Sequence, residues 1–291
     1  MLNQTNKLID GKAVSTALRE KLTLKCGNLF AKYAIKPKLA IVLVGEDPAS
    51  QVYVNSKKTA CAQVNILSEV IHLPQTATQE EVENEIKKLA SDQSVNGIMV
   101  QLPLPKGLDE NSAIALIPAE KDVDGLTVLN AGKCYLDGDG FIPCTPKGIM
   151  QLLYAYNIPL SGKHAVIVGR SKLVGKPIAM QLLSENCTVT ICHSRTQDLS
   201  YHTKQADILI VAVGKKHLIN AEMVKNGAVV IDVGINRENG KLYGDIDFDS
   251  VVNTASLITP VPGGVGPMTV TMLLTNTFEA CLKQNGVKDE F

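Results

Sequence analysis

The sequence predicts an α/β protein of two domains, each built on a parallel sheet. With 291 residues and 45% apolar content, the chain is long enough for about two domains with full hydrophobic cores. Apolar runs of strand length alternate with amphipathic stretches of helix length through most of the chain. Several of these runs are almost continuous Val, Ile and Leu, which is typical of strands buried on both faces.

The first half contains three predicted strands with helices between them. The strands are "KLAIVLVG" at 38–45, "VIHL" at 70–73 and "GIMVQLPL" at 97–104. One helix is predicted to start near Ser50. Another starts at Thr78, because Glu81 follows it at the spacing of a capping box.

A second series of elements begins after "PCTPKG", where Thr145 can cap a helix and Pro146 can take its first position. The series continues as the helix "GIMQLLYAY", the strand "HAVIVG", the helix "KPIAMQLLSEN" and the strands "TVTIC", "ADILIVAVG" and "AVVIDVG". A last helix, at about 269–284, follows "TPVPGGVGPMT", and we expect it to pack on the first domain. These limits give one domain at 1–143 plus 269–291 and another at 144–268, with the active-site cleft between them.

Composition argues against several classes of function. With 29 basic and 29 acidic residues the chain has no net charge, so we expect neither a nucleic-acid nor a membrane partner. No run approaches the roughly 20 apolar residues of a membrane span. The seven cysteines form no C-x-x-C pair and the first ten residues are polar, which favours a cytoplasmic protein with buried thiols. The five histidines are scattered, so no metal site is predicted.

The stretch "VIVGRSKLVGKP" has the context of a phosphate-binding loop but not its usual glycine spacing. Gly169 ends a buried strand and Pro177 lies at the start of a helix, whereas the dinucleotide fingerprint would need further glycines at 171 and 174. The chain has Ser171 there, and its next glycine is Gly175. Backbone N–H groups at the helix start, together with the Ser171 hydroxyl, can hold a pyrophosphate. A simple strand-to-helix turn is the alternative.

The next strand favours NADP over NAD. NAD enzymes place an acidic residue about 20 residues past the loop, but "TICHSRT" supplies Ser194 and Arg195 instead. Arg170 lies inside the loop itself, and an arginine can pair with a 2′-phosphate through two hydrogen bonds. The alternative is that both arginines are solvated surface residues.

In the first half, polar side chains collect around the predicted strand ends. Tyr53 and Lys57 are four residues apart on a predicted helix and so share a face, although a lone lysine is most often a solvated charge. Gln101 lies at the carboxyl end of a buried strand, where α/β proteins bind ligands. "KDVDG" adds Asp122 and Asp124 in a polar, turn-like loop.

Together these stretches resemble the bifunctional 5,10-methylenetetrahydrofolate dehydrogenase/5,10-methenyltetrahydrofolate cyclohydrolase family. The resemblance runs from about 49 to 270 and rests on "ASQVYVNSKK", "GIMVQLPLP", "EKDVDG", "FIPCTPKG", "GRSKLVGKP", "VTICHSRT", "ADILIVAVG", "VVIDVGIN", "GDIDF" and "TPVPGGVGPMT". Members carry this G-R-S-x-x-V-G-x-P form of the loop. The resemblance implies a Rossmann-type NADP-binding domain, a folate substrate and a homodimer.

The resemblance also implies residue roles. Lys57 is the catalytic lysine, and Tyr53, Gln101 and Asp124 complete the catalytic and substrate-binding set. The residues implied for the second domain are Gly169, Arg170, Ser171, Gly175, Ser194 and Ile235 at the NADP site, with Pro262 and Gly263 bordering the shared cleft. One departure is "LTV" at 126–128, where many members have Phe-His-Pro.

Two other functions remain open from the residues. An NADP oxidoreductase on the shikimate-dehydrogenase or amino-acid-dehydrogenase plan would explain the loop but not "KDVDG" together with "VQLPLP". A catalytically silent folate or nucleotide sensor would not need Lys57, Gln101 and Asp124 together. The combination therefore favours the bifunctional enzyme.

Overall fold

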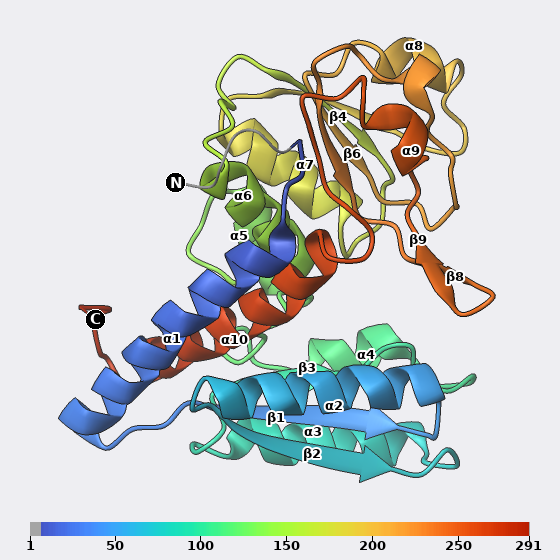
Figure 1. Ribbon diagram of the computed structural model, residues 1–291. Coiled ribbons are helices and arrows are strands. Elements are labelled where there is room, and N and C mark those ends of the chain that lie inside the picture. Colours follow the sequence, from blue (N-terminus) through green and yellow to red (C-terminus); the bar gives the residue numbers. More distant parts are fainter. Residues whose placement is uncertain (1–6, 291) are drawn as a thin grey trace. The chain divides into compact units, whose positions relative to one another are not determined.

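Residues 7–290 are described by the computed structural model, and they form two units with separate parallel sheets (Figure 1). The first unit comprises Ala17–Cys144 and the chain from Val270 onward; the second comprises Thr145–Thr269 and the described N-terminal residues through Thr16. The predicted α/β class with parallel sheets is confirmed. The domain limits of 1–143 plus 269–291 and 144–268 stay predictions.

The first unit has a three-stranded sheet in the order β2–β1–β3. Its strands are β1 Lys38–Val44, β2 Leu67–Leu73 and β3 Gly97–Val100, and both pairings are parallel. β3 ends earlier than predicted, before Pro103, which has no N–H group to donate to a ladder. A parallel bridge between Ile98 of β3 and Asp122 places the "KDVDG" segment beside this edge strand of the sheet.

Local capping fixes where the two helices beside this sheet begin. α2 Pro48–Gln63 starts at Pro48 rather than Ser50, because Asp47 accepts a hydrogen bond from the Ser50 N–H at 2.8 Å. α3 Gln79–Ser91 has the predicted capping box: Thr78 accepts from the Glu81 N–H at 3.2 Å, and Glu81 accepts from the Thr78 N–H at 2.7 Å. Both helices therefore start at residues that the sequence marks.

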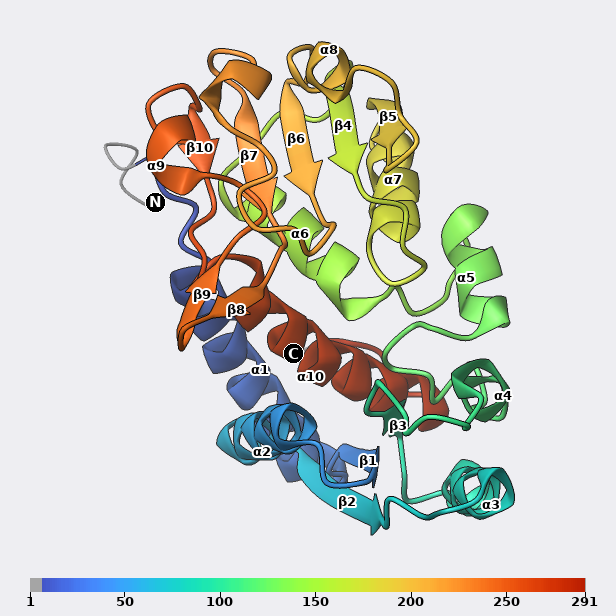
Figure 2. The ribbon, with the colours of Figure 1, turned by 90° about the vertical axis from the view of Figure 1, so that its right-hand side faces the viewer.

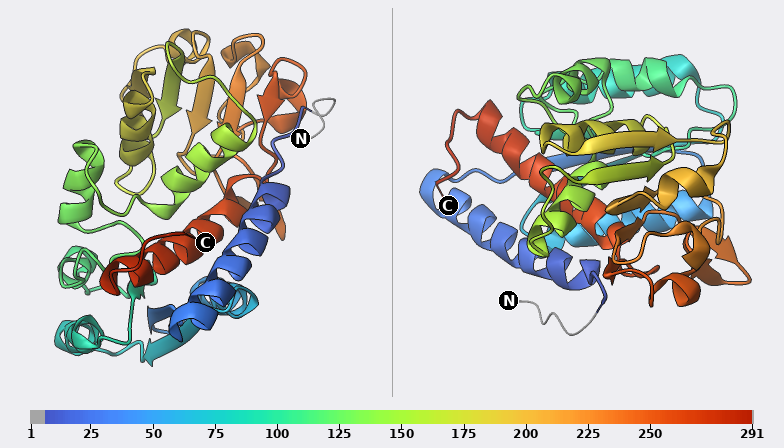
Figure 3. Two further views of the ribbon diagram at one scale, coloured as in Figure 1. Left: turned by 90° about the vertical axis from the view of Figure 1, so that its left-hand side faces the viewer. Right: turned by 90° about the horizontal axis from the view of Figure 1, so that it is seen from above.

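A long first helix was not predicted. α1 Gly11–Tyr33 buries Leu22, Cys26 and Leu29, which follow helical spacing but are separated by polar residues. In the first unit it lies beside α10 Val265–Gln284 (Figure 3), where Arg19 Nε donates to Thr271 Oγ1 at 2.9 Å. Two shorter helices, α4 Glu110–Ala115 and α5 Val128–Tyr135, complete this unit.

The last helix returns to the first unit, as predicted. From Val270 onward α10 belongs to this unit. Asn276 is fully buried, and its side-chain amide donates to the carbonyl oxygens of Val123 at 2.8 Å and Ile142 at 3.3 Å. This residue ties the C-terminal helix to the loops on either side of α5.

The second unit has a five-stranded parallel sheet in the order β10–β7–β6–β4–β5 (Figure 2). The strands are β4 His164–Val168, β5 Thr188–Cys192, β6 Ile208–Val211, β7 Val229–Asp232 and β10 Leu257–Ile258. The other elements are α6 Cys144–Ala155, α7 Gly175–Ser184, α8 Leu199–Thr203, the 3₁₀ helix η1 Ala221–Met223, the antiparallel hairpin of β8 Asn236–Glu238 and β9 Lys241–Tyr243, and α9 Phe248–Val251.

One predicted cap in this unit is wrong. α6 begins at Cys144, so Thr145 and Pro146 both lie inside its first turn. The Thr145 hydroxyl instead lies 3.0 Å from the Thr269 hydroxyl at the start of α10. Among residues 7–290, no helix has the length and hydropathy of a membrane span.

Replacing Asn276 tests how α10 is attached. Asn276→Ala removes the amide that donates to Ile142 O and to Val123 O, and leaves Val123 O only the weak Cys144 thiol donor, so the free energy of unfolding should fall by about 1–3 kcal/mol. Thr275→Ala is the matched control, because its hydroxyl donates only one turn back along the helix, to Thr271 O at 3.0 Å. Urea unfolding followed by circular dichroism measures both variants. Equal midpoints for the two would contradict the role assigned to Asn276.

Candidate active site

A buried lysine forms the centre of the first unit's polar cluster. Lys57 lies on the buried stripe of α2 with Ser50, Val54 and Cys61, and only 8% of it is exposed. Its Nζ donates to Gln101 Oε1 at 2.7 Å, so the structure brings together two of the residues predicted for the site. The charged form of a lysine is costly to bury, and a single amide acceptor offsets only part of that cost.

The end of β3 holds Gln101 in one orientation. Its backbone N–H donates to Val42 O at 2.9 Å, and its side-chain Nε2 donates to Leu102 O at 2.7 Å. Because the amide nitrogen is engaged, the amide oxygen faces Lys57. The sheet therefore sets the position of the acceptor, and α2 sets the position of the amine.

Asp124 and Cys144 lie near this pair. Burial raises the pKa of the half-buried Asp124 above its usual value, whereas the Lys57 charge and a hydrogen bond from Cys144 lower it. Burial lowers the pKa of Lys57, and the negative charge of Asp124 opposes that shift. Burial thus disfavours the charged form of each group, and the opposite charge of the other group offsets part of that effect. The result is an amine that releases its proton more easily than a surface lysine does.

Tyr53 is one helical turn before Lys57 on α2, as predicted, and its side chain is 49% exposed. An exposed ring beside a buried amine is free to stack against a flat ligand. That contact stays a prediction.

The two acids of "KDVDG" have different functions. Asp122 is 1% exposed, and its carboxylate accepts from the N–H groups of Leu126 and Thr127 and from Asn130 Nδ2 at 2.8–3.1 Å. Asp122 is therefore a structural residue that holds the start of α5, and Asp124 alone belongs with Lys57. The "LTV" departure has a local reason as well, because Thr127 is the N-cap of α5 and accepts from the Asn130 N–H at 3.3 Å.

In the second unit, the loop between β4 and α7 requires both of its glycines. Gly169 has φ +131°, and an added Cβ would lie 2.3 Å from Ala212 O. A Cβ on Gly175 would lie 2.2 Å from Gly169 O. The backbone is thus packed against itself and against the end of β6. This close approach is the feature that a phosphate cradle needs, so the loop fits a dinucleotide.

Ser171 bonds to the start of α7, and its predicted role at the cofactor site stays a prediction. Its hydroxyl accepts from the N–H groups of Val174 at 3.1 Å and Gly175 at 3.3 Å, and its carbonyl accepts from Lys176 at 3.1 Å. The first-turn N–H groups of α7 that were expected to be free are therefore bonded to Ser171. Ser171 closes the loop on the helix, and a pyrophosphate would have to displace these bonds or use the amides of the preceding loop residues.

The predicted 2′-phosphate residues lie at neighbouring strand ends. β4 and β5 are paired with Val168 opposite Cys192, and the Gly169 N–H donates to Cys192 O at 2.9 Å. Directly after β5, a tight turn in which the His193 N–H donates to Thr196 Oγ1 at 2.8 Å leaves Ser194 and Arg195 exposed. Arg170 is also exposed, on the loop after β4. All three side chains thus follow adjacent parallel strands.

The remaining predicted residues follow β7 and precede α10. Ile235 is 50% exposed, directly after the "DVG" turn at the end of β7. Pro262 and Gly263 lie in the second unit on the loop before α10, where Gly263 O accepts from the Lys12 N–H at 3.0 Å. Their place at a cleft shared with Lys57, Gln101 and Asp124 stays a prediction.

Two features of the sites were missed from the sequence. Cys144 was expected to be only a small buried hydrophobe, and it is buried, but it also forms a hydrogen bond with Asp124 and acts electrostatically on Lys57. The "PCTP" motif was the available signal. Asp245 also escaped notice, although "GDIDF" contained it.

The fold and these two groups of residues define a class: α/β oxidoreductases that have a dinucleotide-binding unit and a separate polar site. Comparisons with known proteins narrow it. The profile of the tetrahydrofolate dehydrogenase/cyclohydrolase catalytic domain matches residues 9–124, and that of the corresponding NAD(P)-binding domain matches residues 143–285. The chain belongs to the tetrahydrofolate dehydrogenase/cyclohydrolase family.

Individual relatives are similar along nearly the whole chain. The bifunctional protein FolD of Exiguobacterium sibiricum is 53% identical over 94% of this chain and 98% of its own length. The crystal structure of FolD from Campylobacter jejuni has a TM-score of 0.93 at 49% identity, covering 95% of this chain and 98% of that one. The Trypanosoma brucei FolD structure, complexed with NADP and an inhibitor, has a TM-score of 0.91 at 37% identity, covering 95% and 97%.

Enlarging Gly175 tests the phosphate loop. In Gly175→Ala the new methyl group displaces the carbonyl of Gly169 and the N–H of Arg170, so NADPH binding should weaken by about tenfold or more. Gly27→Ala is the matched control, because that helical glycine has open space around it. Fluorescence titration with NADPH measures both. Unchanged affinity in a folded Gly175→Ala protein would remove the loop from the cofactor site.

Proposed function

We propose that this chain catalyses both reactions of its family. The first is the NADP⁺-dependent oxidation of 5,10-methylenetetrahydrofolate to 5,10-methenyltetrahydrofolate, and the second is hydrolysis of that product to 10-formyltetrahydrofolate. The observation that carries the proposal is the buried Lys57 amine, which donates to Gln101 and lies near Asp124. Burial lowers the pKa of this amine. A silent sensor would not need to bury a lysine at this energetic cost.

Asp124 and Tyr53 are the proposed folate-binding groups. The pterin edge presents paired N–H donors, and a carboxylate accepts two such bonds at once. Asp124 is half-buried beside Lys57, which places this acceptor next to the amine. The exposed Tyr53 ring, one turn away, offers an apolar face for the flat rings of the substrate.

The oxidation step depends mainly on positioning. Bound NADP⁺ supplies the hydride acceptor, and no proton need leave the reacting carbon. The residues proposed to hold the dinucleotide are Gly169, Arg170, Ser171, Gly175, Ser194 and Ile235. Lys57 and Gln101 orient the substrate in this step without exchanging a proton.

The hydrolysis step requires a proton acceptor. The attacking water must lose a proton, and a ring nitrogen must gain one before the ring opens. A lysine with its usual pKa is a poor base, but burial lowers the pKa of Lys57 and so increases its neutral fraction. Gln101 Oε1 accepts from Nζ whether the amine is neutral or charged, so the amine stays in place while it gains and loses the proton.

NADP⁺ is the proposed cofactor in preference to NAD⁺. Arg170 and the exposed Ser194–Arg195 turn follow adjacent strands and offer donors to a 2′-phosphate. The nearest acid after β5, Asp198, is the N-cap of α8, and its carboxylate accepts from the Tyr201 N–H at 3.1 Å. It is thus engaged in a local cap rather than facing a ribose.

We also propose a cytoplasmic homodimer. All seven cysteines are buried free thiols, which supports a reducing compartment. The dimer is supported by the family resemblance.

Replacing Lys57 separates the two reactions. Lys57→Met keeps the length of the side chain and removes the amine, so methenyltetrahydrofolate hydrolysis should fall by about 10²- to 10⁴-fold, with dehydrogenase activity reduced less. The measurements are the decay of supplied methenyltetrahydrofolate and the formation of NADPH from methylenetetrahydrofolate.

Lys58→Met is the control, because Lys58 is exposed on the same helix. A folded Lys57→Met protein that hydrolyses methenyltetrahydrofolate at the parent rate would show that Lys57 is not the base. A parent protein with neither activity would contradict the proposed function itself.

A further inference from the structure

Two buried carboxyl groups lie at the carboxyl edge of the second unit's sheet, outside the residues used above. Asp232 is the last residue of β7 and is 3% exposed; Asp245 follows β9 and is fully buried. They come from the stretches "VVIDVGIN" and "GDIDF". Burying two acids side by side is costly, so they need compensating donors.

Asp245 binds the loop that follows β6. Its Oδ2 accepts from the N–H groups of Val213 at 2.7 Å and Gly214 at 3.0 Å, and its Oδ1 accepts from that of Lys215 at 2.7 Å. Oδ1 also accepts from Asn236 Nδ2 at 3.0 Å. One carboxylate thus joins the segment after β6 to the segment after β7.

Asp232 binds the segment after β7 and the segment after β9 in the same way. Its Oδ1 accepts from the N–H groups of Gly234 at 3.0 Å and Asp245 at 2.9 Å, and its Oδ2 accepts from Ile246 at 3.0 Å. Burial raises the pKa of Asp232 to about 6, and the charge of Asp245 acts in the same direction.

The two acids interlock through two glycines. A Cβ on Gly234 would lie 2.2 Å from Asp245 Cγ, and a Cβ on Gly244 would lie 1.8 Å from Asp232 Oδ2. Each acid therefore packs against the backbone beside the other acid, and only glycine permits that approach.

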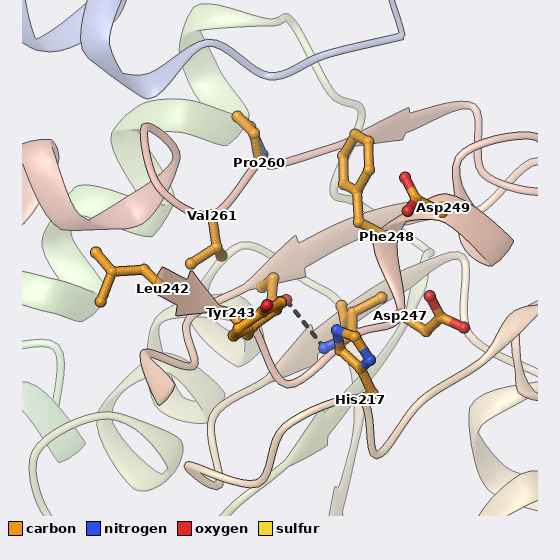
Figure 4. Close-up of a pocket in the computed structure, with 11 residues that line it drawn as sticks. His217, Leu242, Tyr243, Asp247, Phe248, Asp249, Pro260 and Val261 are labelled. Carbon is orange, nitrogen blue, oxygen red and sulfur yellow. Dashed lines mark hydrogen bonds between the residues drawn. The ribbon is translucent and has the colours of Figure 1, made fainter. Parts of the chain in front are cut away.

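The loop after β6 is attached a second time, farther along. Figure 4 shows the pocket of about 330 Å³ beside this segment, with His217 and Tyr243 on its wall and the His217 N–H directed at Gly244 O at 3.3 Å. Ile219 N–H also donates to Asp245 O at 3.2 Å. Segments 213–219 and 244–247 are thus bonded at both ends.

This network lies next to two of the proposed cofactor residues, Ile235 and Gly169. Ile235 lies between Gly234, which donates to Asp232, and Asn236, which donates to Asp245. Gly169 of the phosphate loop packs directly on Ala212 O, next to the Val213 N–H that Asp245 holds. The carboxyl pair therefore connects Ile235 to the phosphate loop through the loop after β6.

We propose that Asp245, backed by Asp232, is the positioning residue that fixes the segments after β6, β7 and β9, and through them holds Ile235 and the backbone on which Gly169 packs for NADP binding. The inference rests on the proposed function, because it assumes that Ile235 and the phosphate loop hold the dinucleotide. Asp245 is not a ligand group here: its oxygens face backbone amides and the Asn236 amide, and it is fully buried. It acts by holding the backbone beside the residues proposed to bind the cofactor.

Asp245→Asn tests the inference, because it keeps the shape but turns an amide NH₂ toward backbone donors. We expect the Kd for NADPH and the KM for NADP⁺ to rise by about tenfold or more, with dehydrogenase kcat changing less. Hydrolysis of methenyltetrahydrofolate should be retained, because Lys57, Gln101 and Asp124 belong to the other unit. Asp247→Asn is the control, because the Asp247 side chain makes no capping hydrogen bond to α9.

A second, milder variant guards against loss of folding. Asn236→Ala leaves both carboxyls in place and removes the bond beside Ile235, so the Kd for NADPH should rise by about three- to tenfold with little change in melting temperature. NADPH affinity equal to that of the parent in folded Asp245→Asn and Asn236→Ala would overturn the inference. A parallel loss of both activities, together with a lower melting temperature, would reduce Asp245 to a purely structural residue and also overturn it. A parent protein that does not bind NADPH would contradict the proposed function, and the inference with it.

Discussion

The hydrogen bond from the Lys57 amine to Gln101 is the interaction on which the chemistry of this protein depends. It joins a helix to the end of a parallel strand across a buried contact of 2.7 Å. A lysine in this position loses its hydration, which disfavours the charged amine, and only the Gln101 amide oxygen and the negative charge of Asp124 stabilise that charge in place of water. These two groups replace the lost hydration only in part, so the pKa of Lys57 is lowered and the amine can act as a base.

A second buried lysine shows the contrast. Lys121 is 7% exposed, and its Nζ donates to the carbonyl oxygens of Ala90 at 2.9 Å and Asp92 at 2.7 Å, with Leu89 at 3.4 Å. Those carbonyls are at the carboxyl end of α3, where a cation is stabilised by the helix dipole. Burial lowers the pKa of Lys121 as it does that of Lys57, and the charges of Asp92 and Glu120 oppose that shift. Lys121 bonds a helix end through several carbonyl oxygens, whereas Lys57 has a single amide acceptor and a ligand-accessible neighbour in Tyr53. The two lysines thus share the direction of their pKa shift and differ in their acceptors and in their access to a ligand.

Patterns that act over a few residues could be predicted from the sequence. The buried strands, the Thr78 capping box, the Tyr53–Lys57 spacing and the strand-end position of Gln101 all follow from local rules, and each is present in the structure. The features that escaped prediction depend on distant segments. Cys144 is more than 80 residues from Lys57 in the chain, and Asp245 is bonded to a loop about 30 residues before it. The bonds of Ser171 to Val174 and Gly175 were missed for a different reason: the sequence shows a hydroxyl near a helix start but not whether it binds that helix or a ligand.

The direct test of this account is the titration of the Lys57 amine itself. In protein labelled with ¹³C-lysine, the side-chain signal that disappears in Lys57→Met can be followed by NMR from neutral to alkaline pH. The account predicts that this signal titrates below the usual lysine value of 10.5, at lower pH than the signals of exposed lysines, because burial lowers its pKa. A Lys57 signal that titrates together with the exposed lysines would contradict the claim that the fold prepares this amine as a base.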